Sequence, residues 1–242
     1  MTALSVTGLS KQYGEVAALD RVDLTVRSGE VHAIVGLNGA GKTTLMASVV
    51  GQIRPDAGSI SILGVERRDA RPALWAHVGH LVGHPFGYPE LTVRENIAAG
   101  ARLHSLPTTL ADSAADEWIT RLDLERWADR RARTLSLGNA QRLGLACVLA
   151  HRPDLLILDE PSNALDPAGV LLLRDAILER GSAGAGVLVS SHHLDEVARV
   201  ADRISVVHAG QIIGHLEPHG VDIERTFFAM IRDSDLVTEH GG

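Results

Sequence analysis

The sequence predicts an α/β fold built around a central, mostly parallel sheet. Short runs of β-branched and other apolar residues recur along the chain, and most of the later runs alternate with segments of helical periodicity. The run Leu155–Leu158 is apolar at every position, as expected of a central parallel strand that is covered on both faces. With 242 residues, 45% of them apolar, the chain is long enough to bury one sizeable core and a smaller subdomain.

The expected strands are short, and helical patterns separate the two halves of the set. In chain order the strands are Leu4–Val6, Val22–Val26, Val31–Val35, Leu155–Leu158, Val187–Ser190 and Ile204–Val207. Between about residues 74 and 137 the strand signals disappear, and Leu91–Leu103 and Leu110–Leu122 have helical patterns with a break at Pro107. We therefore expect one domain over residues 1–242, with a mostly helical subdomain at about 74–137 inserted into the α/β core.

Several helix ends have local signals of their own. Thr92-Val93-Arg94-Glu95 has the form of a capping box, which predicts the start of a helix. Asp166-Pro167 places a cap residue before a proline at the first helical position, and Gly181 is the expected stop. Near the end of the chain, Arg225–Ile231 has the pattern of a short amphipathic helix.

Composition and charge exclude some classes of function. The chain has 23 Lys and Arg against 30 Asp and Glu, a net charge of −7, and no basic run of five or more, so we expect no nucleic-acid partner. The single cysteine, Cys147, lies in an apolar run and is expected to be a small buried hydrophobe rather than a reactive thiol. We find neither a signal segment nor an apolar run near the roughly 18 residues of a membrane span. Any membrane role is therefore expected to come through a partner.

A glycine-rich loop follows the expected strand Val31–Val35 and leads into a helix that starts at Gly41. Such a loop lets consecutive backbone N–H groups converge on a triphosphate at a helix N-terminus. Lys42 would reach the β- and γ-phosphates, and the Thr43 hydroxyl could ligate Mg²⁺. The alternative is an ordinary glycine-rich turn, which would not explain Lys-Thr at this offset. The residues expected to bind nucleotide here are Gly36, Asn38, Gly39, Ala40, Gly41, Lys42, Thr43 and Thr44.

Two carboxylates and a histidine follow the ends of two other expected strands. Asp159 and Glu160 come directly after Leu155–Leu158, at the edge where parallel sheets bind their ligands. Asp159 could hold Mg²⁺, while Glu160 could orient and deprotonate the water that attacks the γ-phosphate. His192 follows the strand Val187–Ser190 and would project at the same edge. The alternatives are a pair of solvated loop acids and an ordinary exposed histidine.

A second small-residue turn, Leu135–Arg142, also opens a helix and offers backbone donors and the Ser136 hydroxyl to an anion. One chain cannot readily direct two helix N-termini at one triphosphate. The turn is therefore expected to act in a dimer, where it would close over the nucleotide held by the other protomer.

Taken together, these segments resemble the ATP-binding subunits of ATP-binding-cassette transporters, and the resemblance covers nearly the whole chain. Tyr13 matches the aromatic residue that stacks on adenine in that family, and Ser136 and Gly138 belong to its signature motif. The other matching segments are Gly36–Thr44 (Walker A), Leu135–Arg142 (signature), Leu155–Glu160 (Walker B with the catalytic glutamate), Ser162–Asp166 (D-loop) and Ser191-His192 (histidine switch).

The resemblance implies a phosphate-loop NTPase core, an N-terminal antiparallel β portion and an inserted helical subdomain. It implies Mg²⁺-dependent ATP hydrolysis, with Lys42, Glu160 and His192 as catalytic residues, Thr43 and Asp159 at the metal, and Asp166 among the nucleotide contacts. The expected partners are a transmembrane permease and a second ATP-binding subunit, identical or not, at the cytoplasmic face of the membrane. The chain is most similar to subunits of bacterial drug, antibiotic or peptide exporters. An importer subunit, a nucleotide-sensing subunit and a non-transport cassette are the alternatives.

One position departs from the family pattern. After the segment Val78–Val82 the family normally has a glutamine that touches Mg²⁺ or the attacking water, whereas this chain has Gly83. His84 or His80 could substitute, and a surface role is the alternative for both. Phe86 and Tyr88 follow in a turn-rich stretch where the permease docks in the family, although they could simply pack the helical subdomain.

Overall fold

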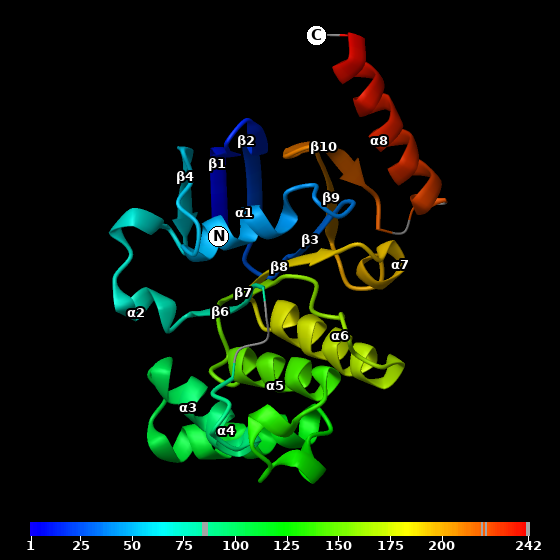
Figure 1. The fold of residues 1–242 in the computed structure, drawn as a ribbon. Helices are drawn as coiled ribbons and strands as arrows, with labels where there is room; N and C mark the ends of the chain where they lie inside the picture. The colour runs from blue at the N-terminus through cyan, green and yellow to red at the C-terminus, as the bar shows by residue number, and fades with distance from the viewer. Residues whose placement is uncertain (84–86, 219, 221, 241–242) are drawn as a thin grey trace.

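The computed structural model describes residues 1–83, 87–218, 220 and 222–240. These residues form two sheets with helices packed around them (Figure 1). The helical segment of the middle of the chain lies at one end of the molecule, and the N-terminal strands lie at the other (Figure 1). The mixed α/β fold predicted from the sequence is confirmed, including its antiparallel N-terminal portion.

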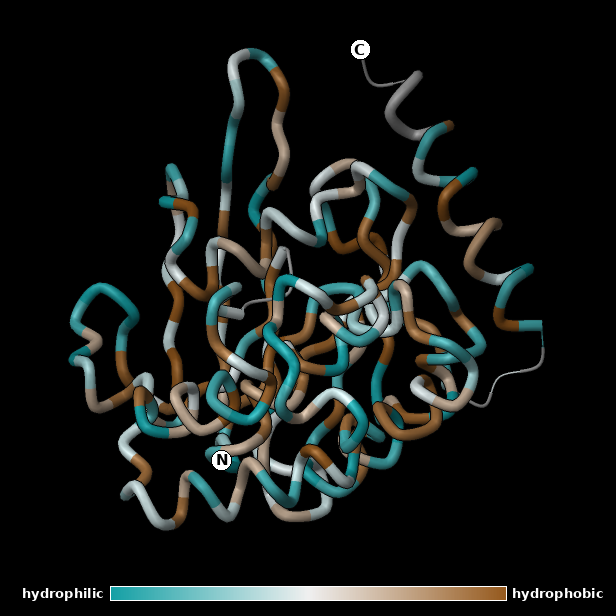
Figure 2. The backbone as a smooth tube through the Cα atoms, turned by 60° about the horizontal axis from the view of Figure 1, so that its bottom comes forward, coloured by the Kyte–Doolittle hydropathy of each residue, from teal (hydrophilic) through white to brown (hydrophobic). Residues whose placement is uncertain are grey.

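The smaller sheet is antiparallel and has the strand order β2-β1-β4-β5. Its strands are β1 (Thr2–Tyr13), β2 (Val16–Arg27), β4 (Ala57–Ile62) and β5 (Val65–Glu66). Buried and exposed residues alternate along most of β2, so one face of this sheet packs on the core and the other meets solvent. The long β1–β2 hairpin projects beyond the rest of the molecule in Figure 2.

The larger sheet has six strands in the order β10-β9-β3-β8-β7-β6. They are β3 (Val31–Val35), β6 (Val78–Leu81), β7 (Leu155–Leu158), β8 (Gly186–Ser191), β9 (Arg203–His208) and β10 (Gln211–Leu216). All neighbours pair in parallel except β10, which runs antiparallel to β9. Every residue of β3, β7 and β8 is buried, as the apolar runs predict.

The pairing register brings the loops after three central strands to one edge of the larger sheet. Val35 of β3 lies opposite Ser191 of β8, and Leu158 of β7 lies opposite Val189 of β8. The chain therefore leaves β3, β7 and β8 on the same side, and the segments that follow them are neighbours although they are far apart in the sequence.

The sequence showed no strand signal between about residues 74 and 137, but the structure has one strand there. β6 lies in this stretch and pairs in parallel with β7 at the edge of the larger sheet. It has four residues, two of which are Gly79 and His80, so its propensity signal is weak. Gly79 is required by close packing, because a Cβ there would lie 2.4 Å from the carbonyl oxygen of Val148.

The helices of the middle segment follow β6 and pack on one another. They are α3 (Val93–Leu103), α4 (Thr108–Arg121) and α5 (Leu137–Leu149), with two short 3₁₀ turns at Glu125–Trp127 and Ala132–Thr134. The capping box predicted at Thr92 and Glu95 is present in full, and Pro107 directly precedes α4 as expected. Trp118 of α4 is almost completely buried in their common core. Cys147 of α5 is buried as well, and burial raises the pKa of its thiol to about 12.

The remaining helices flank the larger sheet or follow it. They are α1 (Lys42–Val50), α2 (Pro72–Trp75), α6 (Pro167–Ser182), α7 (Leu194–Val197) and α8 (Ile223–His240), with a 3₁₀ turn at Arg67–Asp69. α6 is capped by Asp166 and ends one residue after Gly181, close to its predicted bounds. α8 is longer than the tail helix predicted from the sequence. It packs through Phe227 and Ile231, and its C-terminal end leads away from the body (Figure 2).

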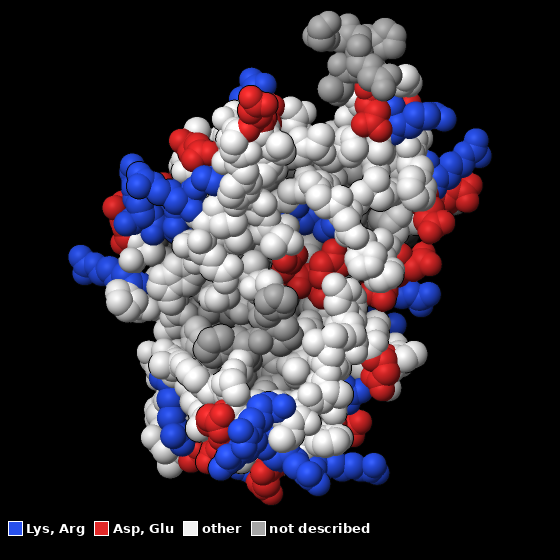
Figure 3. Space-filling model, viewed as in Figure 1, with Lys and Arg blue, Asp and Glu red and all other residues white. Residues whose placement is uncertain are grey.

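Charged side chains of both signs are interspersed around the rim of the face shown in Figure 3, and uncharged side chains fill most of its middle. Acidic side chains and a recessed basic group come together near the centre of this face (Figure 3). Among the described residues, no helix combines the length and apolar character that crossing a membrane requires.

Candidate active site

The loop between β3 and α1 requires glycine at three positions. Gly39 and Gly41 have φ angles of +82° and +109°, in the region that favours glycine. A Cβ at Gly41 would lie 2.6 Å from the carbonyl oxygen of Ala18, and one at Gly36 would lie 2.3 Å from that of Val207. The loop is thus held between the β1–β2 hairpin and β9, and its backbone curves around the N-terminus of α1.

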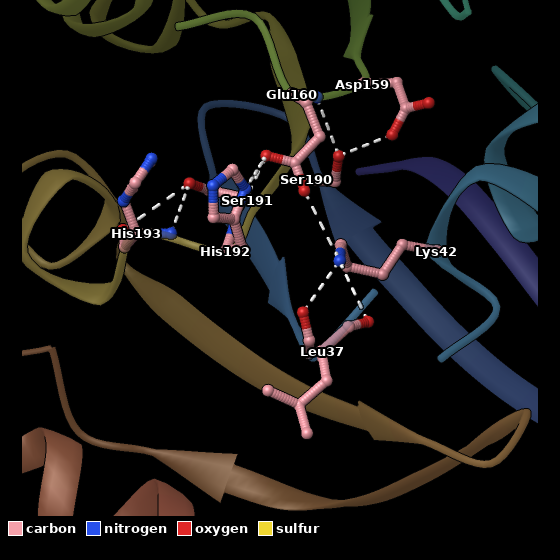
Figure 4. A network of polar contacts seen from close by, with 9 residues as sticks. Leu37, Lys42, Asp159, Glu160, Ser190, Ser191, His192 and His193 are labelled. Carbon is pink, nitrogen blue, oxygen red and sulfur yellow. Dashed lines mark hydrogen bonds and ion pairs between the residues drawn. The ribbon is translucent and has the colours of Figure 1, made fainter. Parts of the chain in front are cut away.

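Lys42 is the first residue of α1, and its side chain turns back into the loop (Figure 4). Only 6% of this residue is exposed. Its ammonium group donates to the carbonyl oxygens of Gly36 at 2.7 Å and Leu37 at 3.4 Å, and lies 3.3 Å from Oε1 of Glu160. The one buried lysine of the loop is therefore already directed at the carboxylate that follows β7.

Glu160 lies between this lysine and the histidine that follows β8 (Figure 4). Its Oε2 accepts a hydrogen bond from the backbone N–H of His192 at 3.3 Å and lies 2.7 Å from Nδ1 of the same residue. Because each carboxylate oxygen has a partner on a different element, the orientation of the Glu160 carboxylate is fixed by Lys42 on one side and His192 on the other.

The backbone of Glu160 is in an unusual conformation, with a φ angle of +47°. A non-glycine residue in the left-handed region costs about 1–2 kcal/mol, so the surrounding contacts must hold it there. One of them is the hydroxyl of Ser190 on β8, which accepts from the Glu160 N–H at 2.8 Å. The same hydroxyl donates to Oδ1 of Asp159 at 2.6 Å, so Ser190 links the two acidic residues (Figure 4).

A pocket of about 300 Å³ opens between the loop, the turn after β7 and the turn after β8. Its walls combine a buried ammonium group, backbone N–H groups of a helix N-terminus and two threonine hydroxyls, which is the donor set that a triphosphate requires. Threonine and carboxylate oxygens are also the hard ligands that Mg²⁺ prefers. The lining residues are Ala18, Asn38, Gly39, Ala40, Gly41, Lys42, Thr43, Thr44, Glu160, Asn163 and His192.

Asp159, a predicted metal ligand, is not among the lining residues of this pocket. It is 8% exposed, and its carboxylate faces Ser190. It directly precedes Glu160, which does line the pocket. Its contact with a metal ion stays a prediction.

Tyr13, predicted to contact adenine, stands at the end of β1 and does not line the pocket either. It is 50% exposed, and the ammonium group of Lys11 lies 5.4 Å from its ring centroid. The hairpin that carries Tyr13 does border the pocket, through Ala18 of β2. The Tyr13 ring is half exposed, and its stacking on adenine stays a prediction.

The predicted signature turn lies at the N-terminus of α5, outside the pocket of its own chain. The Ser136 hydroxyl accepts from the N–H of Asn139 at 3.3 Å and so caps the helix, while Leu137 is 69% exposed. A Cβ at Gly138 would lie 2.7 Å from the carbonyl oxygen of Ala164, so this glycine allows α5 to approach the turn after β7. Within one chain, the structure does not bring these residues to the phosphate loop.

Asp166, predicted as a nucleotide contact, has protein partners in the structure. Its Oδ1 accepts from the N–H of Gly169 at 2.8 Å and from Nη2 of Arg142 at 2.6 Å. These hydrogen bonds, the one from Gly169 first, lower the pKa of the Asp166 carboxyl. It acts as the N-cap of α6 and an anchor for α5, and its contact with nucleotide remains untested.

The segment after β6 is described only in part. Gly83 is exposed with a φ angle of +82°, and among the described residues a Cβ there would meet no atom within 4 Å. His80 packs edge-on against Trp75, with ring centroids 6.5 Å apart, and does not line the pocket. Desolvation by burial, followed by the charge of His104, lowers the pKa of His80. His84 and Phe86 lie outside the described residues, and Tyr88 is 45% exposed.

Two polar residues of the site were missed in the sequence. Ser190 lies near the end of β8, two residues before His192, and a serine that follows an apolar run at this edge of the sheet was the available signal. Asn163 lines the pocket from the turn after β7. It belongs to the segment that resembles the D-loop, but it was not among the residues expected to bind nucleotide.

Fold and site together define an α/β protein with a phosphate loop and a carboxylate placed beside the loop lysine. The family described as ABC transporter matches residues 19–163. The chain therefore belongs to the ABC transporter family as one of its ATP-binding cassettes, and ATP hydrolysis is the reaction characteristic of these cassettes.

Similar proteins include several bacterial ATP-binding subunits. The chain is 40% identical over 212 residues to the daunorubicin resistance ATP-binding protein DrrA3 of Streptomyces coeruleorubidus, covering 88% of this chain and 67% of the relative. It is 35% identical over 219 residues to the lantibiotic transport ATP-binding protein SrtF of Streptococcus pyogenes, covering 90% of this chain and 92% of the relative. A solved structure described as the ATP binding subunit of an ABC transporter superimposes with a TM-score of 0.83 at 29% identity, covering 98% of each chain.

Proposed function

We propose that this chain hydrolyses ATP to drive export of a substrate through a separate transmembrane partner. The observation that carries the proposal is the fixed carboxylate of Glu160, 3.3 Å from Lys42 and 2.7 Å from His192 at the mouth of the phosphate loop. Relatives named for daunorubicin resistance and lantibiotic transport support export of a drug or peptide antibiotic. The partner would hold the chain at the cytoplasmic face of the membrane.

Each residue of the site has a role in this proposal. Lys42 and the loop N–H groups bind the terminal phosphates, and Glu160 takes the proton of the attacking water. His192 keeps the carboxylate of Glu160 in its orientation through Nδ1 and its backbone N–H. Thr43 and Asp159 would hold Mg²⁺, which supplies charge neutralisation at the phosphates when it is bound.

A dimer would complete the site. Ser136 and the exposed N-terminus of α5 are anion-binding groups without access to the phosphate loop of their own chain. In a head-to-tail pair, this N-terminus would face the nucleotide of the second cassette, which is either a copy of this chain or a related subunit. The cassette dimer would then carry two nucleotides between its protomers.

The central test replaces the proposed base. In Glu160→Gln the carboxylate becomes an amide of the same shape, so nucleotide binding should persist while steady-state ATP turnover falls by about 10²–10⁴. Turnover is measured by phosphate release from the purified chain with and without its permease, and binding by a fluorescent ATP analogue. Glu224→Gln, an exposed glutamate in the first turn of α8, is the control and should match the wild type.

Full turnover in Glu160→Gln would refute the assignment of the base. Direction is tested separately in inside-out membrane vesicles that contain the chain and its permease. ATP-dependent accumulation of the substrate inside such vesicles is the expected result for an exporter, and ATP-dependent loss from them would indicate import.

A further inference from the structure

One face of α5 lies along the segment that runs from Pro161 to Asp166. Gly138, Gln141 and Arg142 are spaced i, i+3 and i+4, so they lie on the same face of the helix. This segment connects Glu160 to the N-terminus of α6. The first turns of α5 are therefore in direct contact with the backbone that carries the proposed base.

Two of these residues hold the beginning and the middle of the segment. The side-chain amide of Gln141 donates to the carbonyl oxygen of Pro161 at 2.9 Å, and both groups are buried. At Gly138 the helix approaches so closely that a Cβ would lie 2.7 Å from the carbonyl oxygen of Ala164.

Arg142 holds the end of the segment, and it is the charged member of the set. Its side chain is 7% exposed, and its Nη2 donates to Oδ1 of Asp166 at 2.6 Å. Gly169 makes room for it in the first turn of α6, because a Cβ there would lie 3.3 Å from both Nε and Nη2 of the guanidinium. The ion pair of Arg142 and Asp166 is therefore a closely packed contact between α5 and the N-terminus of α6.

The other amino group of the guanidinium reaches the end of α4. Nη1 donates to the carbonyl oxygen of Leu122 at 3.0 Å and to Oδ2 of Asp123 at 3.2 Å. Arg142 therefore joins α4, α5 and the start of α6 through a single planar group whose donors point in fixed directions.

The segment that Arg142 holds also forms part of the nucleotide pocket. The N–H of Asn163 donates to the carbonyl oxygen of Glu160 at 3.1 Å, and both residues line the pocket. A shift of the segment would move the carboxylate of Glu160 away from Lys42 and His192. Displacements of about 1 Å at a reacting group can lower rates by about 10²-fold.

We propose that Arg142 is a positioning residue, which sets the carboxylate of Glu160 by anchoring Asp166 to the ends of α4 and α5. The inference rests on the proposed role of Glu160 as the base. In this proposal, the position of the Glu160 carboxylate depends on where α4 and α5 lie, as well as on the phosphate loop.

The test compares two buried arginines that differ in what they hold. Arg142→Lys keeps the positive charge but cannot reach Leu122 and Asp166 together. Arg180→Lys is the matched control, because Arg180 is 9% exposed and its Nη2 donates to the carbonyl oxygens of Arg152 and Pro153, at the far end of α6. Both variants should lose some stability in urea unfolding.

Only Arg142→Lys should lower kcat for ATP, by about tenfold to hundredfold, with the affinity for a fluorescent ATP analogue within about twofold of wild type. Asp166→Asn gives an independent check, since asparagine still caps α6 but carries no charge for the guanidinium. It should lower kcat in the same direction, and the double variant Arg142→Lys, Asp166→Asn should be no slower than the slower single variant. Hydrogen exchange should rise in residues 161–166 and stay unchanged in the phosphate loop.

Wild-type kcat in folded Arg142→Lys and Asp166→Asn would overturn the inference, as would an equal loss of kcat in Arg180→Lys. Glu160→Gln is measured in parallel. If it is inactive while the arginine and aspartate variants are fully active, the positioning role fails and the proposed function stands. If Glu160→Gln is itself fully active, the assignment of Glu160 as the base fails, and the positioning role that rests on it fails as well.

Discussion

Gly83 follows β6 at the place where the family has a glutamine, and its backbone makes the replacement more than the loss of an amide. With φ at +82°, Gly83 has a backbone conformation that residues other than glycine rarely adopt. No described residue lies within 4 Å of the Cβ position, so the constraint seen at Gly83 lies in the backbone and not in packing. The proposed base, Glu160, is held by other residues.

We predict that Gly83→Gln changes basal ATP turnover by less than about tenfold, which is under ~1.4 kcal/mol of barrier. Lys42 and His192 already fix both oxygens of Glu160 without any group from position 83. The variant should lose about 1 kcal/mol of folding stability, because glutamine has to adopt the left-handed conformation. Turnover is measured with and without the permease and its substrate, since the ratio of stimulated to basal activity is where a change is expected.

Gly64→Gln separates the two effects, because Gly64 is exposed with a φ angle of +80° and open space at its Cβ position. It should show the same loss of stability and a normal ratio of stimulated to basal activity. A wild-type protein without measurable hydrolysis that is activated by Gly83→Gln would instead favour a nucleotide-sensing subunit.

The spatial meeting of Lys42, Glu160 and His192 was predictable, because each follows the end of a strand in one parallel sheet. The partners that hold them were not. Ser190 and Arg142 lie in the sequence among residues of ordinary composition, and their roles depend on which turn packs against which helix face. Single-residue propensities contain no information about such contacts between distant segments.

At the scale of elements, a hydrogen-bond chain ties the two sheets together at the floor of a cavity of about 690 Å³. Arg203 lies 3.1 Å from Nε2 of His215, and Nδ1 of that ring lies 3.0 Å from the Ser205 hydroxyl. The hydroxyl lies 2.7 Å from Nε2 of His32, and Nδ1 of His32 lies 2.9 Å from the carbonyl oxygen of Thr25. Arginine can only donate and a carbonyl can only accept, so Arg203 donates to Nε2 of His215, and Nδ1 of His32 donates to Thr25. With both rings neutral, His215 then donates to Ser205, and Ser205 donates to His32.

In this series of hydrogen bonds, the neutral forms of His32 and His215 each use one ring nitrogen as donor and the other as acceptor. Burial lowers the pKa of His32 from the ordinary 6.5 to about 4, and burial together with Arg203 lowers the pKa of His215. Above pH 6.5 the folded and unfolded states both carry a neutral His32, so the residue adds no pH dependence there. As the pH falls from 6.5 towards 4, the unfolded chain binds a proton that the folded state excludes, and stability is lost.

We predict that His32 alone removes about 2 kcal/mol of folding stability between pH 7.5 and pH 5. The measurement is urea unfolding of the wild type and His32→Gln at both pH values. Glutamine cannot satisfy both Thr25 and Ser205, so the variant should be about 1–2 kcal/mol less stable at pH 7.5. Its further loss on acidification should be smaller than that of the wild type by about the contribution of His32. Equal losses in the two proteins would contradict the assignment of this acid sensitivity to His32.

Elements were predictable where the local signal and the packing agree. β7 is apolar at every position, β3 and β8 are mostly apolar, and every residue of the three strands is buried. The helix caps predicted at Thr92 and Asp166 are present. β6 contains a glycine that tertiary packing requires, because a Cβ at Gly79 would lie 2.4 Å from the carbonyl oxygen of Val148. A residue chosen for close approach weakens the propensity signal of the strand that contains it.

For the whole molecule, the main consequence of the fold is that the two helix N-termini proposed to bind nucleotide, those of α1 and α5, do not face the same pocket. The N-terminus of α1 points into the pocket beside Glu160, whereas the N-terminus of α5 has its exposed residue Leu137 outside that pocket. The face of α5 that carries Gln141 and Arg142 packs against the segment 161–166 of the same chain. A second protomer is therefore the simplest source of the groups that would close over the nucleotide.

We predict that two inactive protomers can restore one active site when they are combined. Lys42→Ala removes the phosphate-binding ammonium group, and Ser136→Arg replaces a helix cap with a bulky cation at the proposed interface. Each homodimer then carries the same defect in both sites and should be inactive. In a heterodimer of the two, Lys42 of the Ser136→Arg protomer faces Ser136 of the Lys42→Ala protomer, so one of the two sites is intact.

Heterodimers isolated through two different affinity tags should regain ATP turnover, up to about half of the wild-type value if the two sites act independently. Circular dichroism and urea unfolding of each single variant show that the folds are retained, since loss of the Ser136 cap should cost only about 1 kcal/mol. If all three species are folded and equally inactive, the arrangement in which α5 of one protomer acts on the nucleotide of the other is wrong.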